Sequence, residues 1–291
     1  MDELKKHQPS MSIDKQISNL KEKGLVVNDE DYTKKVLNDI SYFRLIKAYS
    51  LGLKEKNGNY NPGTSFEQIV ELYEFNLRFR QITFCMIERV EVSLRCRIGN
   101  YISEEYGVMG YLDKENFDKD DYHKAFLDDI KEEIRRNSRA PFVKNFRENY
   151  EDGELPVYAL VEILSLGTLS KLFKNMKNRD KKIVSRSYGV GYTYMESWIE
   201  SIAYVRNVCA HYGRLYNAKL VKTPILYKEY TEQGIRNNRV YAVLLCMRSI
   251  LKDDEGWNKY VAEIKELAEH YKGVNLTSMG FPKNWETLLK V

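Results

Sequence analysis

The sequence predicts an all-α protein. Apolar residues recur with helical spacing along most of the chain, and runs of alternating β-branched residues are absent. Only 6 Pro and 16 Gly interrupt the 291 residues, and no Ser/Gly-rich linker or internal repeat divides them. We therefore expect a single helical domain over residues 1–291.

The expected helices begin near the amino terminus. Apolar residues at i, i+4 and i+7 start at Ile13, and Gly24 is a typical helix stop. A shorter helix follows from about Asp31.

A long helix follows the Gly/Asn-rich turn region 57–63. The segment Ser65-Phe-Glu-Gln68 is a capping box, and the helix that it starts should reach about Glu104. Further helices are expected at residues 122–137, 156–166, 168–178, 193–216, 238–252 and 257–271.

Composition and charge exclude several classes of protein. Residues 1–10 lack the apolar core of a signal peptide, and the longest apolar stretch, 241–251, is too short to span a bilayer. The four cysteines, in apolar stretches without metal-ligand spacing, are expected to be free core thiols of a reducing compartment. We expect a cytoplasmic protein without metal, cofactor or membrane contact.

Basic residues gather in one segment although the net charge is only +4. Residues 171–186 hold seven basic side chains against one acidic side chain. Helical spacing would align Lys171, Lys174, Lys177 and Lys181 in a stripe that could follow a nucleic-acid backbone. The alternative is a solvated helix end with lysines near its C-terminal dipole.

The segment 193–216 carries the pattern with the most chemical content. At about 100° per residue, one helix face collects two guanidinium groups, an imidazole and two carboxamides, from Arg206, Asn207, His211, Arg214 and Asn217. Ala203 and Ala210 lie in the same arc and leave room for approach, whereas Tyr204, Val208 and Tyr212 lie on the apolar face. Two fixed cations beside an imidazole suit phosphodiester chemistry. The alternative is an ordinary solvent-exposed polar face.

A second polar group lies on the long helix. Glu88, Glu91 and Arg95 have i, i+3 and i, i+4 spacing and can share one face. If this helix packs against 193–216, the carboxylates would orient His211 or hold Arg206. An intrahelical salt-bridge ladder is the alternative.

The segment Arg206-Asn-Val-Cys-Ala-His211 resembles the R-x4-6-H signature of HEPN ribonucleases. The longer string 204–217 is similar to the Abi-like, abortive-infection branch of that superfamily. Further blocks resemble this family in the same order, at Ser12–Gly24, Ile40–Leu45, Ile87–Arg95 and Pro156–Ser170. The resemblance covers about residues 10–250. One departure is Tyr212, where the family often has a second histidine.

The resemblance implies a HEPN-like helical bundle with additional N- and C-terminal helices. An N-terminal lobe would cover about residues 10–60 and the HEPN core about 65–252. Tyr42 and Arg44, in one of the family blocks, would contact the substrate or pack the lobe.

The implied activity is that of a metal-independent endoribonuclease, a toxin-like effector of phage abortive infection. His211 would act as general acid–base, and Arg206, helped by Arg214, would stabilise the charge on the reacting phosphate. Asn207 joins them in the expected catalytic set. The products would be 2′,3′-cyclic phosphate and 5′-OH ends. Because one imidazole does not readily perform both proton transfers, a homodimer that pairs two motifs is implied.

Two other functions remain open at this point. The first is a non-catalytic HEPN module that binds RNA or a nucleotide, and the second is a dimeric scaffold. The expected partners are an RNA substrate, a second copy of the chain and an antitoxin, either RNA or protein.

Overall fold

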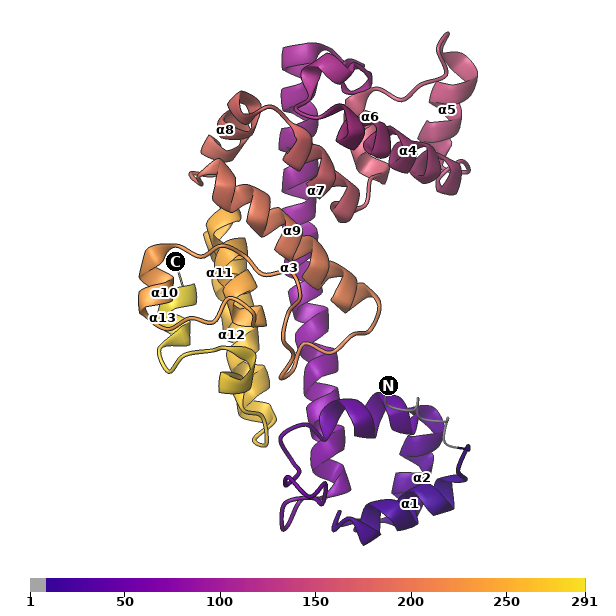
Figure 1. Ribbon diagram of the computed structural model, residues 1–291, viewed down its shortest axis with the longest axis vertical. Helices are drawn as coiled ribbons and strands as arrows, with labels where there is room; N and C mark the ends of the chain where they lie inside the picture. The colour runs from indigo at the N-terminus through magenta and orange to yellow at the C-terminus, as the bar shows by residue number, and fades with distance from the viewer. Residues whose placement is uncertain (1–8, 291) are drawn as a thin grey trace, which may run out of the picture. The chain divides into compact units, whose positions relative to one another are not determined.

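The computed structural model describes residues 9–290, and this part of the chain is all-α, as predicted (Figure 1). Extended pairing in the described chain is limited to isolated bridges such as that between Val26 and Ser65. The prediction about a signal peptide concerns residues 1–10, of which residues 1–8 lie outside the described part. Within the described residues, no helix combines the length and apolarity that a membrane span requires.

The chain forms two compact units. The first contains the residues up to Arg78 together with Leu267–Asn275, and the second contains Phe79–Glu266 and the residues from Leu276 onward. The first unit includes the predicted lobe at about 10–60 and extends beyond it. The single domain with such a lobe stays a prediction.

The first unit opens with two packed helices, α1 (Ile13–Glu22) and α2 (Glu30–Asp39). The Ser12 hydroxyl caps α1 and the Asp29 carboxylate caps α2, so each helix begins where a side chain satisfies an unpaired backbone N–H. The predicted stop at Gly24 is confirmed by its φ of +81°, which favours glycine.

A π-helical turn, η1 (Phe43–Lys47), follows α2. It buries Leu45 and Ile46 and leaves Phe43 and Arg44 exposed. Leu45 and Ile46 therefore pack within the first unit, while the outward side carries the apolar Phe43 ring beside Arg44.

The longest helix is α3 (Phe66–Tyr106), whose residues belong partly to each unit. Its predicted capping box is confirmed. Ser65 Oγ accepts a hydrogen bond from the Gln68 N–H at 3.3 Å, and Gln68 Oε1 accepts one from the Ser65 N–H at 3.1 Å.

The second unit contains the remaining helices. They are η2 (Gly110–Leu112), η3 (Lys114–Asn116), α4 (Asp120–Arg136), α5 (Pro141–Asn149), α6 (Val157–Ile163), α7 (Leu166–Asn175), α8 (Asn178–Arg186), α9 (Tyr192–Ala210), α10 (Lys228–Glu232), α11 (Val240–Ile250), α12 (Asp254–His270), η4 (Leu276–Met279) and α13 (Trp285–Leu289). The last residues of α12 belong to the first unit. Six of these helices, α4, α6, α7, α9, α11 and α12, were predicted near their observed positions.

Helices α5, α8, α10 and α13 were not predicted. Two of them, α10 and α13, have only five residues, which is too short for a helical period to be recognised. Helix α8 is amphipathic but strongly polar, with few apolar residues to mark its buried face. For α5 a signal was present, because Pro141 occupies the first helical position, where proline is favoured.

Helix α9 lies at the centre of the second unit, where it packs against α7, α8 and α11 (Figure 1). Its apolar side chains Trp198, Ile199, Ile202 and Val205 are buried. The Trp198 indole N–H donates a hydrogen bond to the Ile225 carbonyl at 2.6 Å, which ties the following loop to the helix. The core thus holds α9 in place up to its last turn.

Candidate functional site

Helix α9 ends at Ala210, not near residue 216 as predicted. The Tyr212 N–H donates to the Cys209 carbonyl at 3.2 Å, and the Gly213 N–H donates to the Val208 carbonyl at 2.7 Å. This is a Schellman end, in which Tyr212 takes a φ of +58°. A Cβ on Gly213 would lie 2.8 Å from Val208 Cγ1, so the close chain reversal needs glycine there. The Tyr212 side chain is 67% exposed, so its placement on the packed apolar face was wrong.

The early end changes the position of two predicted site residues. Arg214 and Asn217 lie in the loop after the helix, so they do not extend its polar face beyond His211. Arg214 Nη1 donates to the Tyr216 carbonyl at 2.9 Å, and Asn217 Oδ1 accepts a hydrogen bond from Arg239 Nη1 at 3.4 Å. Both side chains therefore hold the loop together.

Four predicted site residues line a cavity of about 220 Å³ between α3 and α9. Glu91 Oε2 lies 3.5 Å from Arg206 Nε across the two helices. The other oxygen of Glu91 accepts a hydrogen bond from Arg95 Nη2, one turn along α3. Glu91 thus makes the interhelical contact and the intrahelical pair at the same time, and Glu88 lines the same cavity. We call this the arginine cavity.

The Arg206 side chain is held by the Glu91 carboxylate and the Phe84 ring. Its guanidinium carbon lies 5.6 Å from the centre of the Phe84 ring, and its side chain is 30% exposed. No described residue accepts a hydrogen bond from it, and its buried Nε lacks a hydrogen-bond partner within the described chain. Because Nε is buried against Glu91, the two Nη groups are the donors available to an anion such as a phosphate.

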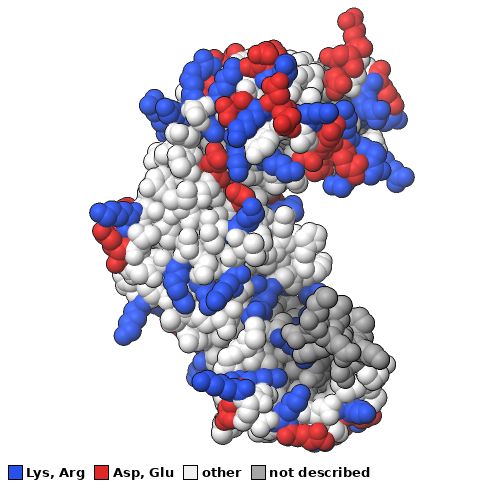
Figure 2. Space-filling model, in the orientation of Figure 1, with Lys and Arg blue, Asp and Glu red and all other residues white. Residues whose placement is uncertain are grey.

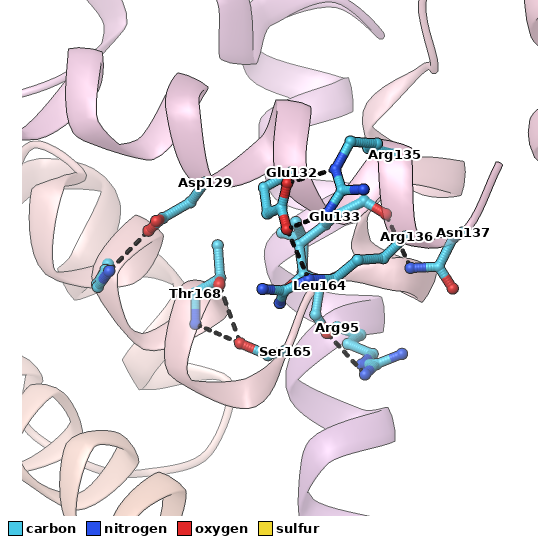
Figure 3. A network of polar contacts seen from close by, with 11 residues as sticks. Arg95, Asp129, Glu132, Glu133, Arg135, Arg136, Asn137, Leu164, Ser165 and Thr168 are labelled. Carbon is cyan, nitrogen blue, oxygen red and sulfur yellow. Dashed lines mark hydrogen bonds and ion pairs between the residues drawn. The ribbon is translucent and has the colours of Figure 1, made fainter.

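Arg95 connects the arginine cavity to the junction of α6 and α7. Its Nη2 donates to the Leu164 carbonyl at 2.8 Å (Figure 3), and its Nη1 donates to the Glu162 carbonyl. Because Leu164 lies between the two helices, this contact fixes the turn that starts α7.

His211 is the C-cap residue of α9, and its side chain is exposed. The end of the helix is held by Arg80 of α3, whose Nη1 donates to the Cys209 carbonyl at 3.0 Å. This contact satisfies a carbonyl of the last helical turn. Arg80 is only 8% exposed, and its guanidinium carbon lies 5.6 Å from the centre of the Tyr212 ring.

Sequence reasoning missed Arg80 although a signal was present. Arg80, Ile87 and Leu94 recur at seven-residue spacing, and the other two are fully buried. A single charge on such an apolar line indicates a side chain with a specific partner.

Asn207 faces a different cavity from its neighbour Arg206. This second cavity has a volume of about 550 Å³ and is lined from α4, α7 and α9. Successive residues on a helix point about 100° apart, which separates the two side chains. Tyr204 and Ala203 also line this cavity, so Tyr204 does not belong to the packed apolar face. Ala203, expected to leave room for a second helix, is only 5% exposed and lies in the wall of this cavity.

The predicted lysine stripe does not form. The helix is interrupted between α7 and α8, so Lys174 and Lys177 lie on different helical segments. Lys181 is only 6% exposed, and its ammonium donates to Glu196 at 3.0 Å and to the Lys174 carbonyl at 3.1 Å. Lys181 is therefore not available to RNA, whereas Lys174 and Lys177 are exposed.

Another group of basic residues, between Arg135 and Arg147, is balanced by neighbouring acids. Glu132 accepts hydrogen bonds from Arg135 at 2.7 Å and from Arg136 at 3.0 Å (Figure 3). Figure 2 shows Lys and Arg interspersed with Asp and Glu over α4 and α5. This region does not present a field of one sign to nucleic acid.

The cysteines only partly match the prediction of free core thiols. All four are free, but Cys85 and Cys96 are exposed. Burial raises the pKa of the Cys209 thiol to about 12, against the opposing effect of Arg80, so this thiol is protonated at neutral pH. In the described part of the chain, no three His, Cys, Asp or Glu side chains gather as metal ligands would.

Arg44 and Tyr42 lie in the first unit, at η1. Arg44 is exposed, and its backbone N–H donates to Ser41 Oγ at 3.2 Å. A role for these two residues in substrate contact stays a prediction.

Comparison with known proteins gives a family match. A family model described as Abi-like protein matches residues 35–217. The matched stretch begins in α2 and ends in the loop after α9, so it contains all of α3 and the arginine cavity. No curated protein and no solved structure matches the chain.

Proposed function

This chain belongs to the Abi-like protein family, which indicates a role in abortive infection, and we propose that it is a HEPN-type endoribonuclease acting as the toxin-like effector of that response. One observation carries the proposal. On α9, Arg206 is held by Glu91 with its remaining donors available, and an exposed imidazole, His211, caps the same helix. A fixed cation and an accessible acid–base group on one element are the parts that phosphodiester cleavage requires.

The proposed reaction uses the nucleophile that RNA carries. His211 takes the proton of the ribose 2′-OH as its oxygen attacks the adjacent phosphorus, and the bond to the departing 5′-oxygen breaks. A second imidazole returns a proton to that oxygen, which leaves 2′,3′-cyclic phosphate and 5′-OH ends. The Arg206 guanidinium stabilises the additional negative charge on the phosphate oxygens. No step requires a metal ion.

The second imidazole would come from a second copy of the chain. His211 is the only histidine of the α9 motif, and Tyr212 occupies the next position. Its exposed position at the helix end leaves it accessible to a partner. In this homodimer each chain contributes one His211 and one Arg206 to a shared site. The antitoxin that restrains such an effector would be an RNA or a protein.

A non-catalytic RNA-binding module is the second candidate. It is favoured by the single imidazole of the motif and by the pairing of Arg206 with Glu91, which needs no reaction to explain it. Such a module would bind RNA through Arg206 and leave it intact.

The test is cleavage of end-labelled RNA by the purified chain, with and without EDTA. We expect activity that survives EDTA and falls about 10²–10⁴-fold in His211→Ala and by a similar order in Arg206→Ala. Arg206→Lys should recover only part of the activity, because an ammonium lacks the bidentate fork.

A matched control is His270→Ala, which removes another exposed imidazole, on α12. It should cleave at the wild-type rate. A His211→Ala protein that cleaves as fast as wild type would overturn the proposal. Binding of intact RNA by a wild-type chain that never cleaves it would favour the non-catalytic module.

A further inference from the structure

We propose that the second cavity, beside Asn207, binds one nucleotide of a single-stranded RNA substrate, with its base on Tyr204 and its phosphate at Lys174. The inference rests on the proposed function in taking RNA as the substrate. It assigns a substrate subsite to a surface that is separate from the arginine cavity, and the argument comes from the lining of this cavity.

The cavity has the size and the small-residue lining that a nucleotide requires. Its volume of about 550 Å³ lies within the usual range for small-molecule sites, roughly 300–1,000 Å³. Ala125 of α4, Gly167 and Ser170 of α7 and Ala203 of α9 line it. Because these side chains are short, the space between the helices is left to a ligand.

Two tyrosines line the cavity, and they differ in what already contacts their rings. The Lys119 ammonium lies 5.0 Å from the centre of the Tyr122 ring. Tyr204 is half-buried and makes no ring–ring or cation–ring contact with any described residue. Its aromatic face is therefore the one that a base can stack on.

Three lysines line the cavity, and one of them is available to a phosphate. Lys171 is paired with Asp129 at 2.7 Å, and Lys222 is paired with Glu200 at 2.6 Å. Lys174 is exposed and forms no ion pair within the described chain. One unpaired ammonium matches the single charge of one phosphodiester.

Asn207 places this cavity next to the motif. Its carboxamide lines the cavity, while the preceding residue, Arg206, lines the arginine cavity. A nucleotide bound here would be close, along the RNA strand, to the phosphate that Arg206 binds. The Asn207 carboxamide and the Ser170 hydroxyl offer hydrogen bonds to a base edge or a ribose hydroxyl.

The test uses a fluorescent single-stranded RNA oligonucleotide with 2′-O-methyl groups, which cannot be cleaved through the 2′-oxygen. Its affinity is measured by anisotropy for the full chain and for variants. Tyr204→Leu should weaken binding about 10- to 100-fold, whereas Tyr204→Phe, which keeps the ring, should stay within about 2-fold of wild type.

Two further variants act on the space and the charge. Gly167→Leu should fill the cavity and weaken binding without unfolding α7, because a Cβ there meets only Ser165 Oγ, at 3.6 Å. Lys174→Gln should weaken binding about 3- to 10-fold and reduce the dependence of affinity on salt by about one counterion. Lys124→Gln, on the exposed surface of α4 and outside the cavity lining, is the matched control and should bind as wild type does.

Unchanged affinity in Tyr204→Leu and Gly167→Leu would overturn the inference. So would tight binding of a free mononucleotide, such as AMP, with no binding of the oligonucleotide. If these variants lose affinity while the wild-type chain cleaves no RNA, the cavity is supported and the ribonuclease proposal fails. If His211→Ala abolishes cleavage while the cavity variants bind and cleave as wild type, the cavity inference alone fails.

Discussion

At the scale of single residues, the arginine cavity depends on one carboxylate. Glu91 is 8% exposed and interacts with both Arg95 and Arg206. The side chains of Arg95 and Arg206 are 17% and 30% exposed. Removing the carboxylate would leave the partly desolvated Arg95 and Arg206 cations without the anion that they share, which is more costly than the loss of a surface ion pair.

Glu91→Ala should therefore lower the free energy of unfolding by about 3 kcal/mol, near the low end of the range for breaking a buried pair, because Arg206 is partly solvated. Urea denaturation measures this change. RNA cleavage should fall as well, since Arg206 loses the group that positions it. Glu88→Ala is the matched control, because Glu88 is exposed, lines the same cavity and forms no ion pair within the described chain. It should change stability by less than about 0.5 kcal/mol. Equal stability of the two variants would contradict this account of Glu91.

At the scale of elements, a buried carboxylate joins α8 to the end of α3. Asp180 is fully buried, and it accepts hydrogen bonds from the Tyr101 hydroxyl at 2.7 Å and from the Tyr106 hydroxyl at 2.6 Å. Burial by itself would raise the pKa of Asp180, but these hydroxyls and the Arg179 guanidinium together hold that pKa below its ordinary value. Burial and the same hydrogen bond raise the pKa of Tyr106 to about 12.

The lowered pKa of Asp180 predicts acid-sensitive packing of α8. A carboxyl with a lower pKa in the folded state stabilises the fold fully above its unfolded pKa, about 4, and loses this contribution as the pH falls through the folded value. Asp180→Asn should cost roughly 2–3 kcal/mol at pH 7. The difference in unfolding free energy between wild type and variant should then narrow below about pH 4.

Denaturation midpoints measured from pH 7 to pH 3 test this expectation. Asp118→Asn, which changes an exposed carboxylate near the start of α4, serves as the control and should follow the wild type throughout. If the difference in unfolding free energy between wild type and Asp180→Asn stayed constant down to pH 3, the charge of Asp180 would not stabilise α8.

At the scale of the whole molecule, the proposed reaction needs more than one chain. One chain supplies one imidazole and one guanidinium from the α9 motif, and the two cavities beside Arg206 and Asn207 are separate. A site shared by two chains has a kinetic consequence that a site within one chain does not have.

Mixing wild-type chains with His211→Ala chains should therefore reduce RNA cleavage more than dilution does. If both copies must be intact, an equal mixture of freely exchanging chains retains about one quarter of the activity, whereas independent sites retain about one half. Light scattering on the same samples should give twice the mass of one chain. Activity proportional to the wild-type fraction, or a monomeric mass, would remove the shared site from the mechanism.

Sequence reasoning predicted the local features of this protein well. Helical periodicity identified six of the helices of the second unit, and the capping box at Ser65 placed the start of α3. The motif containing Arg206 and His211 led to the same family that the comparison with known proteins supports. These features depend on residues that are close in sequence, so their pattern can be recognised before the chain is folded.

Tertiary structure alone decided how those residues are arranged. At the end of helix α9, Arg80 of α3 holds the Cys209 carbonyl across 129 residues of sequence. The break after α7 buries Lys181 against Glu196, which no helical wheel would show. Packing against different helices sends Arg206 and Asn207 into separate cavities. The fold class and the motif depend on local periodicity and residue type, which the sequence shows directly. The geometry of the site depends on contacts between segments that are distant in sequence, and these contacts form only when the chain folds.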